Sequence, residues 1–273
     1  MSETPPEYIH GTAPEEQRRL TRLNELLNNA SLRELALTGG ERIVDFGCGL
    51  GQLTRAMARA SGARVVGIER SAEQLAEALR QARAAGEEER IDLRAGAVES
   101  PPLTPDEWGA FDLAHTRFVL EHVADPLAVV RQMVRAVRPG GRVVLADDDH
   151  DVLRLWPEPD GFGDVWRAYM HSYERAGRDP YVGRRLVQLL HEAGAAPRRN
   201  TMVFFGSGSG AAEFGDFIEN VVRILDGARA AILATGLVDA RRLERTLVAV
   251  REFGERPDAA LWYAMSWAEG VRR

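Results

Sequence analysis

Three glycines at alternate positions follow a short apolar run near the start of the chain. The run occupies residues 43–46 (Ile-Val-Asp-Phe), and the glycines are Gly47, Gly49 and Gly51. Residues 52–60 have a helical pattern, so the segment predicts a strand, a tight loop and a helix. Glycine lets the loop turn sharply and lets a ligand lie directly against the backbone. Because free N–H groups at the start of the helix would point at that ligand, the segment predicts a ligand-binding loop.

The glycine spacing differs from that of a dinucleotide-binding fingerprint. That fingerprint places its third glycine three residues after the second, whereas here position 52 is Gln and the third glycine is Gly51. The chain also lacks a Tyr-x-x-x-Lys pair, because no lysine follows Gly47. An NAD(P)-binding oxidoreductase is therefore the disfavoured alternative.

A second predicted strand, residues 64–68, ends in an acid. That acid, Glu69, follows a β-branched and apolar run. An acid at the tip of the second strand of such a fold can accept hydrogen bonds from both hydroxyls of a ribose. The two segments together favour a site for a nucleoside-containing cofactor.

Further segments occur in an order that carries a family resemblance. Residues 111–114 (Phe-Asp-Leu-Ala) have the pattern of a fourth strand, residues 120–126 read Leu-Glu-His-Val-Ala-Asp-Pro, and residues 137–141 read Val-Arg-Pro-Gly-Gly. With the glycine loop, they make the chain resemble the class I S-adenosylmethionine (SAM) dependent methyltransferases. The resemblance implies an α/β, Rossmann-like sheet of seven mostly parallel strands, with helices on both faces and an antiparallel last strand.

The resemblance also implies SAM as the cofactor and a set of residues that contact it. In the family, the acid before the glycines orders the loop and the acid after the second strand holds the ribose. Carried over to this chain, the predicted cofactor-binding positions are Asp45, Gly47, Cys48, Gly49, Gly51, Glu69, Arg70, Ala97, Val98 and Thr116. The chain departs from the family at Ala97, where many members have an Asp that meets the adenine amine. Either backbone groups hold the adenine, or Glu99 reaches it.

The rest of the chain predicts additions to this core. Residues 1–40 are expected to form a helical extension or lid, with a capping box at 12–15 and a Tyr8 segment that folds over the cofactor or packs as a loose tail. The methyltransferase domain is expected over residues 41–273. Helical insertions are expected at about 151–196 and 211–258, and the last two strands at 201–205 and 260–267. The insertions are predicted to form the substrate chamber.

Candidate catalytic and substrate-binding residues follow from the predicted strand ends. His115 and His150 are expected after the fourth and fifth strands, where a histidine can serve as a general base. Arg117, Trp166 and Tyr169 are candidates for the substrate site, together with Tyr8. We expect no metal site, because the adjacent acids of the cluster at 147–151 cannot all point at one ion. These carboxylates could instead bind an amine substrate. One of them is expected to cap the next element while the others face water.

Composition restricts the class of partner. The chain has 273 residues, of which 45% are hydrophobic, a net charge of −6 and one cysteine. It has no long basic block and no long apolar run, and its first residues are polar and acidic. We therefore expect a cytoplasmic protein with a small-molecule substrate and without nucleic-acid or membrane binding; a homodimer stays open. The expected function is methyl transfer from SAM to an O, N or C acceptor. The alternative is a methyltransferase-like protein that binds SAM without using its methyl group.

Overall fold

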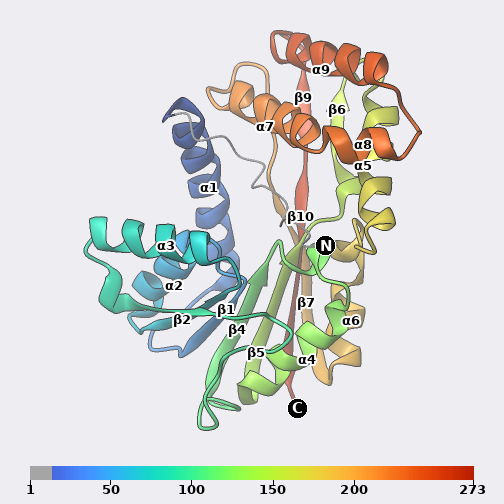
Figure 1. The fold of residues 1–273 in the computed structure, drawn as a ribbon. Helices are drawn as coiled ribbons and strands as arrows, with labels where there is room; N and C mark the ends of the chain where they lie inside the picture. Colours follow the sequence, from blue (N-terminus) through green and yellow to red (C-terminus); the bar gives the residue numbers. More distant parts are fainter. Residues whose placement is uncertain (1–13) are drawn as a thin grey trace. The chain divides into compact units, whose positions relative to one another are not determined.

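The computed structural model describes the backbone of residues 14–273 and the side chains from Asn24 onward. The chain divides into two compact units (Figure 1). Unit 1 comprises the chain up to Leu27 together with His150–Gly177 and Phe204–Ala264. Unit 2 comprises Asn28–Asp149, Arg178–Val203 and Met265–Arg273.

Unit 2 is built on a seven-stranded sheet in the order β3-β2-β1-β4-β5-β10-β7. The strands are β1 (Ile43–Phe46), β2 (Val65–Glu69), β3 (Ile91–Ala95), β4 (Phe111–Arg117), β5 (Val137–Asp147), β7 (Ala195–Phe204) and β10 (Ala264–Arg272). Strands β1 to β5 are parallel to one another, and β10 is antiparallel to β5. The predicted mostly parallel sheet with an antiparallel last strand is confirmed.

Helices cover both faces of this sheet (Figure 1). They are α2 (Gln52–Ser61), α3 (Ala72–Ala84), α4 (Pro126–Ala136), α6 (Leu186–Glu192) and the second half of α1 (Pro14–Leu35). Short 3₁₀ turns are η1 (Glu88–Arg90), η2 (Leu120–His122) and η4 (Val182–Arg185). The central strands are almost continuously apolar, because a parallel sheet is buried on both faces.

Two helix starts agree with the sequence patterns. The Ser71 hydroxyl accepts a hydrogen bond from the backbone N–H of Gln74 at 3.2 Å and caps α3. Helix α1 begins at Pro14, the predicted first helical position. Among the described residues, no helix combines the length and the apolar character that crossing a membrane requires.

Unit 1 contains a small antiparallel sheet in the order β6-β9-β8, of which β6 and β9 are labelled in Figure 1. Its strands are β6 (Arg154–Trp156), β8 (Ser207–Gly208) and β9 (Ala260–Trp262). Its helices after residue 149 are α5 (Phe162–Arg175), α7 (Phe214–Gly227), α8 (Arg229–Ala234) and α9 (Ala240–Gly254), and η3 (His150–Val152) begins the second segment of the unit. Strands of two or three residues leave no readable pattern, so the sequence did not predict β6 or β8. The strand expected at 260–267 is interrupted at Tyr263, which separates β9 from β10.

Candidate active site

The glycine loop joins β1 to α2, as the sequence predicts. Gly47, Gly49 and Gly51 have φ angles of 76°, 54° and 66°, a region that side chains disfavour. A Cβ atom on Gly47 would lie 2.3 Å from Cγ2 of Val119, so the loop also needs the space that glycine leaves. The N–H groups of Gly47 and Cys48 donate to the Ile68 carbonyl at 2.8 and 2.9 Å. These bonds hold the loop against the end of β2.

Glu69 ends β2 beside this loop. Its Oε2 accepts from the Gly49 N–H at 3.2 Å, and its Oε1 accepts from the Ser71 N–H at 2.9 Å. Each carboxylate oxygen has a further lone pair, and the side chain is half-buried rather than enclosed. The carboxylate therefore suits the two hydroxyls of a ribose, and the loop leaves its backbone bare for a ligand. The residues present fit a SAM-type cofactor.

Asp45 supports the loop from inside the sheet. Its side chain is buried, with Oδ2 accepting from Thr54 Oγ1 at 2.6 Å and Oδ1 lying 2.8 Å from Nδ1 of His115. Both oxygens thus serve protein groups on α2 and β4. This geometry agrees with a loop-ordering role for Asp45.

The prediction that His115 follows the fourth strand is wrong. The strand extends to Arg117, so His115 and Thr116 lie inside β4, and both have no exposed surface. A general base must come within hydrogen-bond reach of the proton it removes. A ring buried between strands and bonded to Asp45 does not offer that reach. Its Nε2 is buried without a hydrogen-bond partner among the described residues, and the ring of Trp267 lies 6.3 Å away between centroids.

Thr116 and Arg117 have polar contacts within unit 2. The Thr116 hydroxyl donates to the Phe46 carbonyl at 2.9 Å and ties β4 to β1. Because its side chain is fully buried, only its backbone remains for the predicted cofactor contact. Arg117 donates from Nη1 to Ser31 Oγ at 3.1 Å and from Nη2 to Asn28 Oδ1 at 2.7 Å.

The charge of Arg117 sits in a poorly solvated environment. Burial lowers the pKa of its guanidinium to about 10, although the charges of Asp45 and Asp148 act in the opposite direction. Arginine normally stays protonated far above this range. The surroundings of Arg117 therefore disfavour its charge more than ordinary surface positions do.

The other predicted cofactor positions lie in loops of unit 2. Arg70 is exposed directly after β2, Ala97 is half-buried after β3, and Val98 packs into the core. Glu99, the alternative contact for the adenine, is exposed. Burial raises the pKa of the Cys48 thiol, and the nearby acids add to the effect, so this thiol stays protonated.

The acids at the end of β5 and directly after it are mainly structural. Asp147 Oδ2 accepts from the N–H groups of Val119 and Leu120 at 3.0 and 2.8 Å, and the two oxygens of Asp149 accept from Nε and Nη2 of Arg184 at 2.6 and 2.8 Å. Both acids are buried. The expectation that all but one of these acids face water is therefore corrected. A buried acid in this region can be satisfied by backbone donors and an arginine that the linear sequence does not reveal.

Two nearby buried carboxyls, Glu121 and Asp147, have raised pKa values, which favour their protonated forms. Burial raises the pKa of Glu121 to about 8, partly offset by Arg178. Burial, and then the charge of Glu121, raise the pKa of Asp147 to about 7, against the effect of its backbone donors. His122, expected on a helix, lies in the 3₁₀ turn η2.

His150, Trp166 and Tyr169 form an aromatic cluster inside unit 1. Trp166 Nε1 donates to the His150 carbonyl at 2.7 Å, and the rings of His150 and Tyr169 lie 5.3 Å apart between centroids. All three side chains are 6% exposed. Trp166 and Tyr169 thus pack as core of α5, which argues against the predicted contact with substrate. Tyr8, the remaining substrate candidate, lies outside the described residues.

Three polar residues with a part in this site were missed by sequence reasoning. Thr54 faces the buried side of α2 among apolar residues, and Asn28 and Ser31 lie one helical turn apart near the apolar Leu27 and Leu35 of α1. A polar residue on the buried face of an amphipathic helix is the signal that could have identified them.

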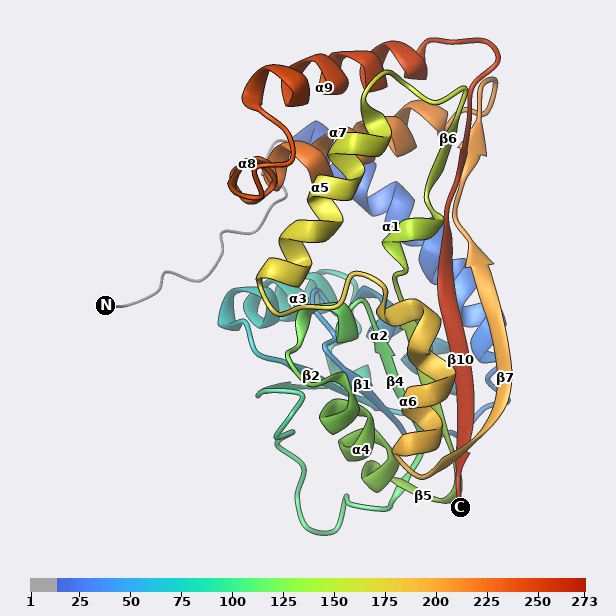
Figure 2. The ribbon, with the colours of Figure 1, turned by 90° about the vertical axis from the view of Figure 1, so that its right-hand side faces the viewer.

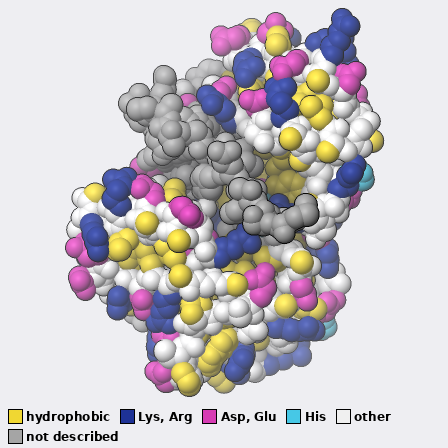
Figure 3. Space-filling view, viewed as in Figure 1, with side chains coloured by type: hydrophobic (Ala, Val, Ile, Leu, Met, Phe, Trp, Pro, Cys, Tyr) yellow, Lys and Arg dark blue, Asp and Glu magenta, His cyan; other side chains and the backbone are white. Residues whose placement is uncertain are grey.

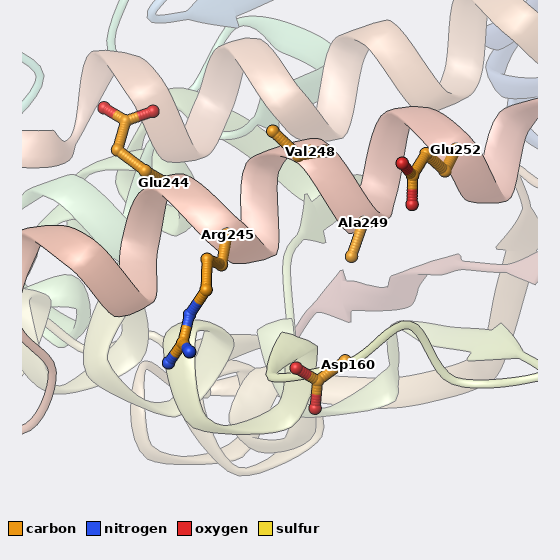
Figure 4. Close-up of a pocket in the computed structure, with 6 residues that line it drawn as sticks. All are labelled: Asp160, Glu244, Arg245, Val248, Ala249 and Glu252. Carbon is orange, nitrogen blue, oxygen red and sulfur yellow. The ribbon is translucent and has the colours of Figure 1, made fainter.

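A shallow hollow occurs on α9 in unit 1 (Figure 4). Its volume is about 400 Å³, and its lining residues are Asp160, Glu244, Arg245, Val248, Ala249 and Glu252. Charged side chains form most of this lining, and none of the predicted site residues contributes to it. The hollow is therefore no candidate for the cofactor.

Comparison with known proteins identifies the family. Residues 15–199, more than half of the chain, match the model of a family described as a methyltransferase domain. The chain belongs to this family. The predicted class, a class I SAM-dependent methyltransferase, is confirmed with it, and SAM is the cofactor of that class.

Individual relatives agree with this assignment. The chain is 34% identical over 153 residues to 27-O-demethylrifamycin SV methyltransferase of Amycolatopsis mediterranei (strain S699), covering 56% of this chain and 53% of the relative. It is 41% identical over 107 residues to a ubiquinone biosynthesis O-methyltransferase of Aeromonas salmonicida (strain A449), covering 39% and 43%. The chain thus spans about half the length of these relatives.

A solved structure shares the fold. It is geranyl diphosphate C-methyltransferase from Streptomyces coelicolor A3(2), with a TM-score of 0.57 and 16% identity over 96% of this chain and 86% of that one. At this level of identity the similarity concerns the fold alone.

Proposed function

We propose that this protein transfers the methyl group of SAM to a small-molecule acceptor, with residues 47–51 and Glu69 holding the cofactor. The observation that carries the proposal is the Glu69 carboxylate at the end of β2, bonded to the N–H of Gly49 and still able to accept from a ribose. The names of the relatives, a rifamycin and a ubiquinone methyltransferase, support a small acceptor.

The chain's own residues would bind and orient rather than react. Bound SAM supplies an electrophilic methyl on a sulfonium. The bare backbone of the glycine loop and the N–H groups at the start of α2 would receive the cofactor, while Asp45 holds the loop from below through Thr54 and His115. Alignment of two reactants in a dry site is itself a large source of rate. A hydroxyl acceptor would also need a base. The assignment of that base to His150, whose side chain is 6% exposed within unit 1, stays a prediction.

Charge distribution supports a small-molecule partner. On the face drawn in Figure 3, the dark-blue arginines and the magenta acids are interspersed among apolar side chains. A nucleic-acid site would favour clustered cations. We therefore propose a small-molecule acceptor rather than nucleic acid, and the cytoplasmic location stays a prediction.

Calorimetry with S-adenosylhomocysteine (SAH) and NADH tests the cofactor site. We expect the wild type to bind SAH and not NADH. Glu69→Ala should weaken SAH binding by roughly 10- to 150-fold, because it removes charge-assisted hydrogen bonds. Glu73→Ala is the matched control, since Glu73 is an exposed acid four residues away. Unchanged SAH affinity in Glu69→Ala, or NADH binding without SAH binding, would refute the proposal.

Methyl-labelled SAM identifies the acceptor. The enzyme is incubated with a metabolite extract, and mass spectrometry finds the compound that gains the label. Formation of SAH without any labelled product, or no turnover despite SAH binding, would favour a protein that binds SAM without methyl transfer.

A further inference from the structure

Arg117 is a cation without a carboxylate partner among the described side chains. Its hydrogen bonds go to the neutral Asn28 and Ser31, and no described acid comes within 4.0 Å of its nitrogens. The ring of Phe118 lies 5.5 Å from the guanidinium carbon. Since a guanidinium has five N–H donors, three donors remain for another group.

Neutral hydrogen bonds do not balance a partly buried charge. A charge withdrawn from water is costly unless an opposite charge faces it. The charges of Asp45 and Asp148 act on Arg117 only over a distance, and both oxygens of Asp45 already contact Thr54 and His115. The direction of the Arg117 pKa agrees with an environment that lacks an adjacent anion. An anionic ligand group would therefore be stabilised here.

The position of Arg117 at the carboxyl end of β4 indicates which anionic group could reach its guanidinium. Arg117 is the last residue of β4, and β1 lies between β4 and β2 in the sheet (Figure 2). The carboxyl ends of these three parallel strands lie at the same edge, with Glu69 at the end of β2 and the glycine loop after β1. Two strand spacings amount to roughly 10 Å. A ligand whose ribose meets Glu69 and whose tail crosses the loop would bring that tail to Arg117.

We propose that Arg117 is the counter-ion of the carboxylate at the methionine end of SAM, held in position by Asn28 and Ser31 of α1. This inference rests on the proposed function, because it takes the ribose to lie at Glu69. Arginine suits the role, since its planar fork can donate two parallel hydrogen bonds to one carboxylate. Helix α1 then positions a cofactor-binding side chain of β4.

Two ligands that differ only in this carboxylate test the proposal. SAH is compared with decarboxylated SAH, which keeps the adenosine, the thioether and the amino group. Calorimetry is performed on the wild type and on Arg117→Gln. We expect Arg117→Gln to bind SAH roughly 10- to 150-fold more weakly, and decarboxylated SAH within about twofold of the wild type. Arg117→Lys keeps the positive charge but lacks the planar fork, so its affinity for SAH should lie between those of the wild type and Arg117→Gln.

The controls separate this role from support of the fold. Arg33→Gln removes an exposed charge from α1, the helix that carries Asn28 and Ser31. It should change the affinity for neither SAH nor decarboxylated SAH. Because the two ligands are compared within each variant, a loss of stability would affect both equally. Equal weakening of both ligands in Arg117→Gln would show that Arg117 only fastens α1 to β4, and would overturn the proposal.

Two further outcomes are distinguishable. Unchanged SAH affinity in Arg117→Gln, with a raised KM for the acceptor, would place an acceptor anion at Arg117 and would also overturn the proposal. Absence of SAH binding in the wild type would instead refute the proposed function on which the inference rests.

Discussion

The carboxylate of Asp45 and the imidazole of His115 form a buried pair, with 2.8 Å between Oδ1 and Nδ1. The two residues lie opposite each other in the register of β1 and β4. Thr54 of α2 donates to the other oxygen of Asp45. One carboxylate therefore connects the strand before the glycine loop, the helix after it and the neighbouring strand.

Replacing His115 should cost stability and leave the pH profile of methyl transfer unchanged. His115→Ala leaves one oxygen of a buried carboxylate without its partner, which should lower the free energy of unfolding by about 1–3 kcal/mol. Denaturant unfolding measures this loss. His171→Ala is the control, because the His171 side chain on α5 is 42% exposed and its loss should change stability by less than about 0.5 kcal/mol. A large fall in kcat with loss of a pH-dependent step would instead restore the general-base role.

Alanine substitutions at Gly47 and Gly62 distinguish two causes of destabilisation, backbone strain and a steric clash of the added side chain. Both have positive φ angles, 76° and 71°, but an added Cβ meets Val119 at Gly47 and nothing within 4 Å at Gly62. Gly62→Ala should cost about 1–2 kcal/mol from conformation alone. Gly47→Ala should cost more and should also weaken SAH binding, as measured by unfolding and calorimetry. Equal costs in the two variants would mean that Val119 simply moves aside.

Glu121 should make the protein less stable as pH rises from about 5 to 8.5. Its folded pKa of about 8 is above the unfolded value of 4.5, so the folded state holds a proton that the unfolded state releases. Its stabilising contribution is complete below about 4.5 and is lost as pH rises through about 8.

Glu121→Gln should remove this part of the pH dependence, on the order of a few kcal/mol. The free energy of unfolding of the wild type and the variant is measured at both pH values. Glu192→Gln, an exposed acid on α6, is the control and should keep the wild-type dependence. If Glu121→Gln loses as much stability as the wild type between about pH 5 and pH 8.5, Glu121 is already ionised in the folded state.

Trp166→Ala should destabilise unit 1 rather than alter substrate binding specifically. Trp166 is 6% exposed and contacts the rings of Phe162 and Tyr169, so truncation should cost about 3–5 kcal/mol. Trp262→Ala is the control, since that ring is 46% exposed on β9 and should cost about 1 kcal/mol or less. Normal stability of Trp166→Ala with a raised acceptor KM would support the substrate role that burial argues against.

Local patterns predicted the parts of this protein that depend on neighbouring residues in the chain. The glycines at 47, 49 and 51 permit positive φ angles and the close approach of neighbouring atoms to the loop backbone. The structure has both features, with Val119 packed against Gly47. Apolar strands and capped helices in regular alternation likewise predicted a parallel sheet, because such strands must be covered on both faces. The parallel sheet of unit 2 and the glycine loop were therefore readable from the sequence by itself, whereas the small sheet of unit 1 was not.

Only the tertiary structure decided which side chains face the ligand and which face the core. His115 and Arg117 are two positions apart on one strand, yet the first bonds to Asp45 in the interior and the second extends to Asn28 and Ser31. The sequence predicted a strand that ends before both, since polar residues in a buried strand resemble a loop when their partners are unknown. Those partners are 70 to 89 residues away in the chain. A buried polar group is stabilised by such distant contacts, and no local pattern contains them.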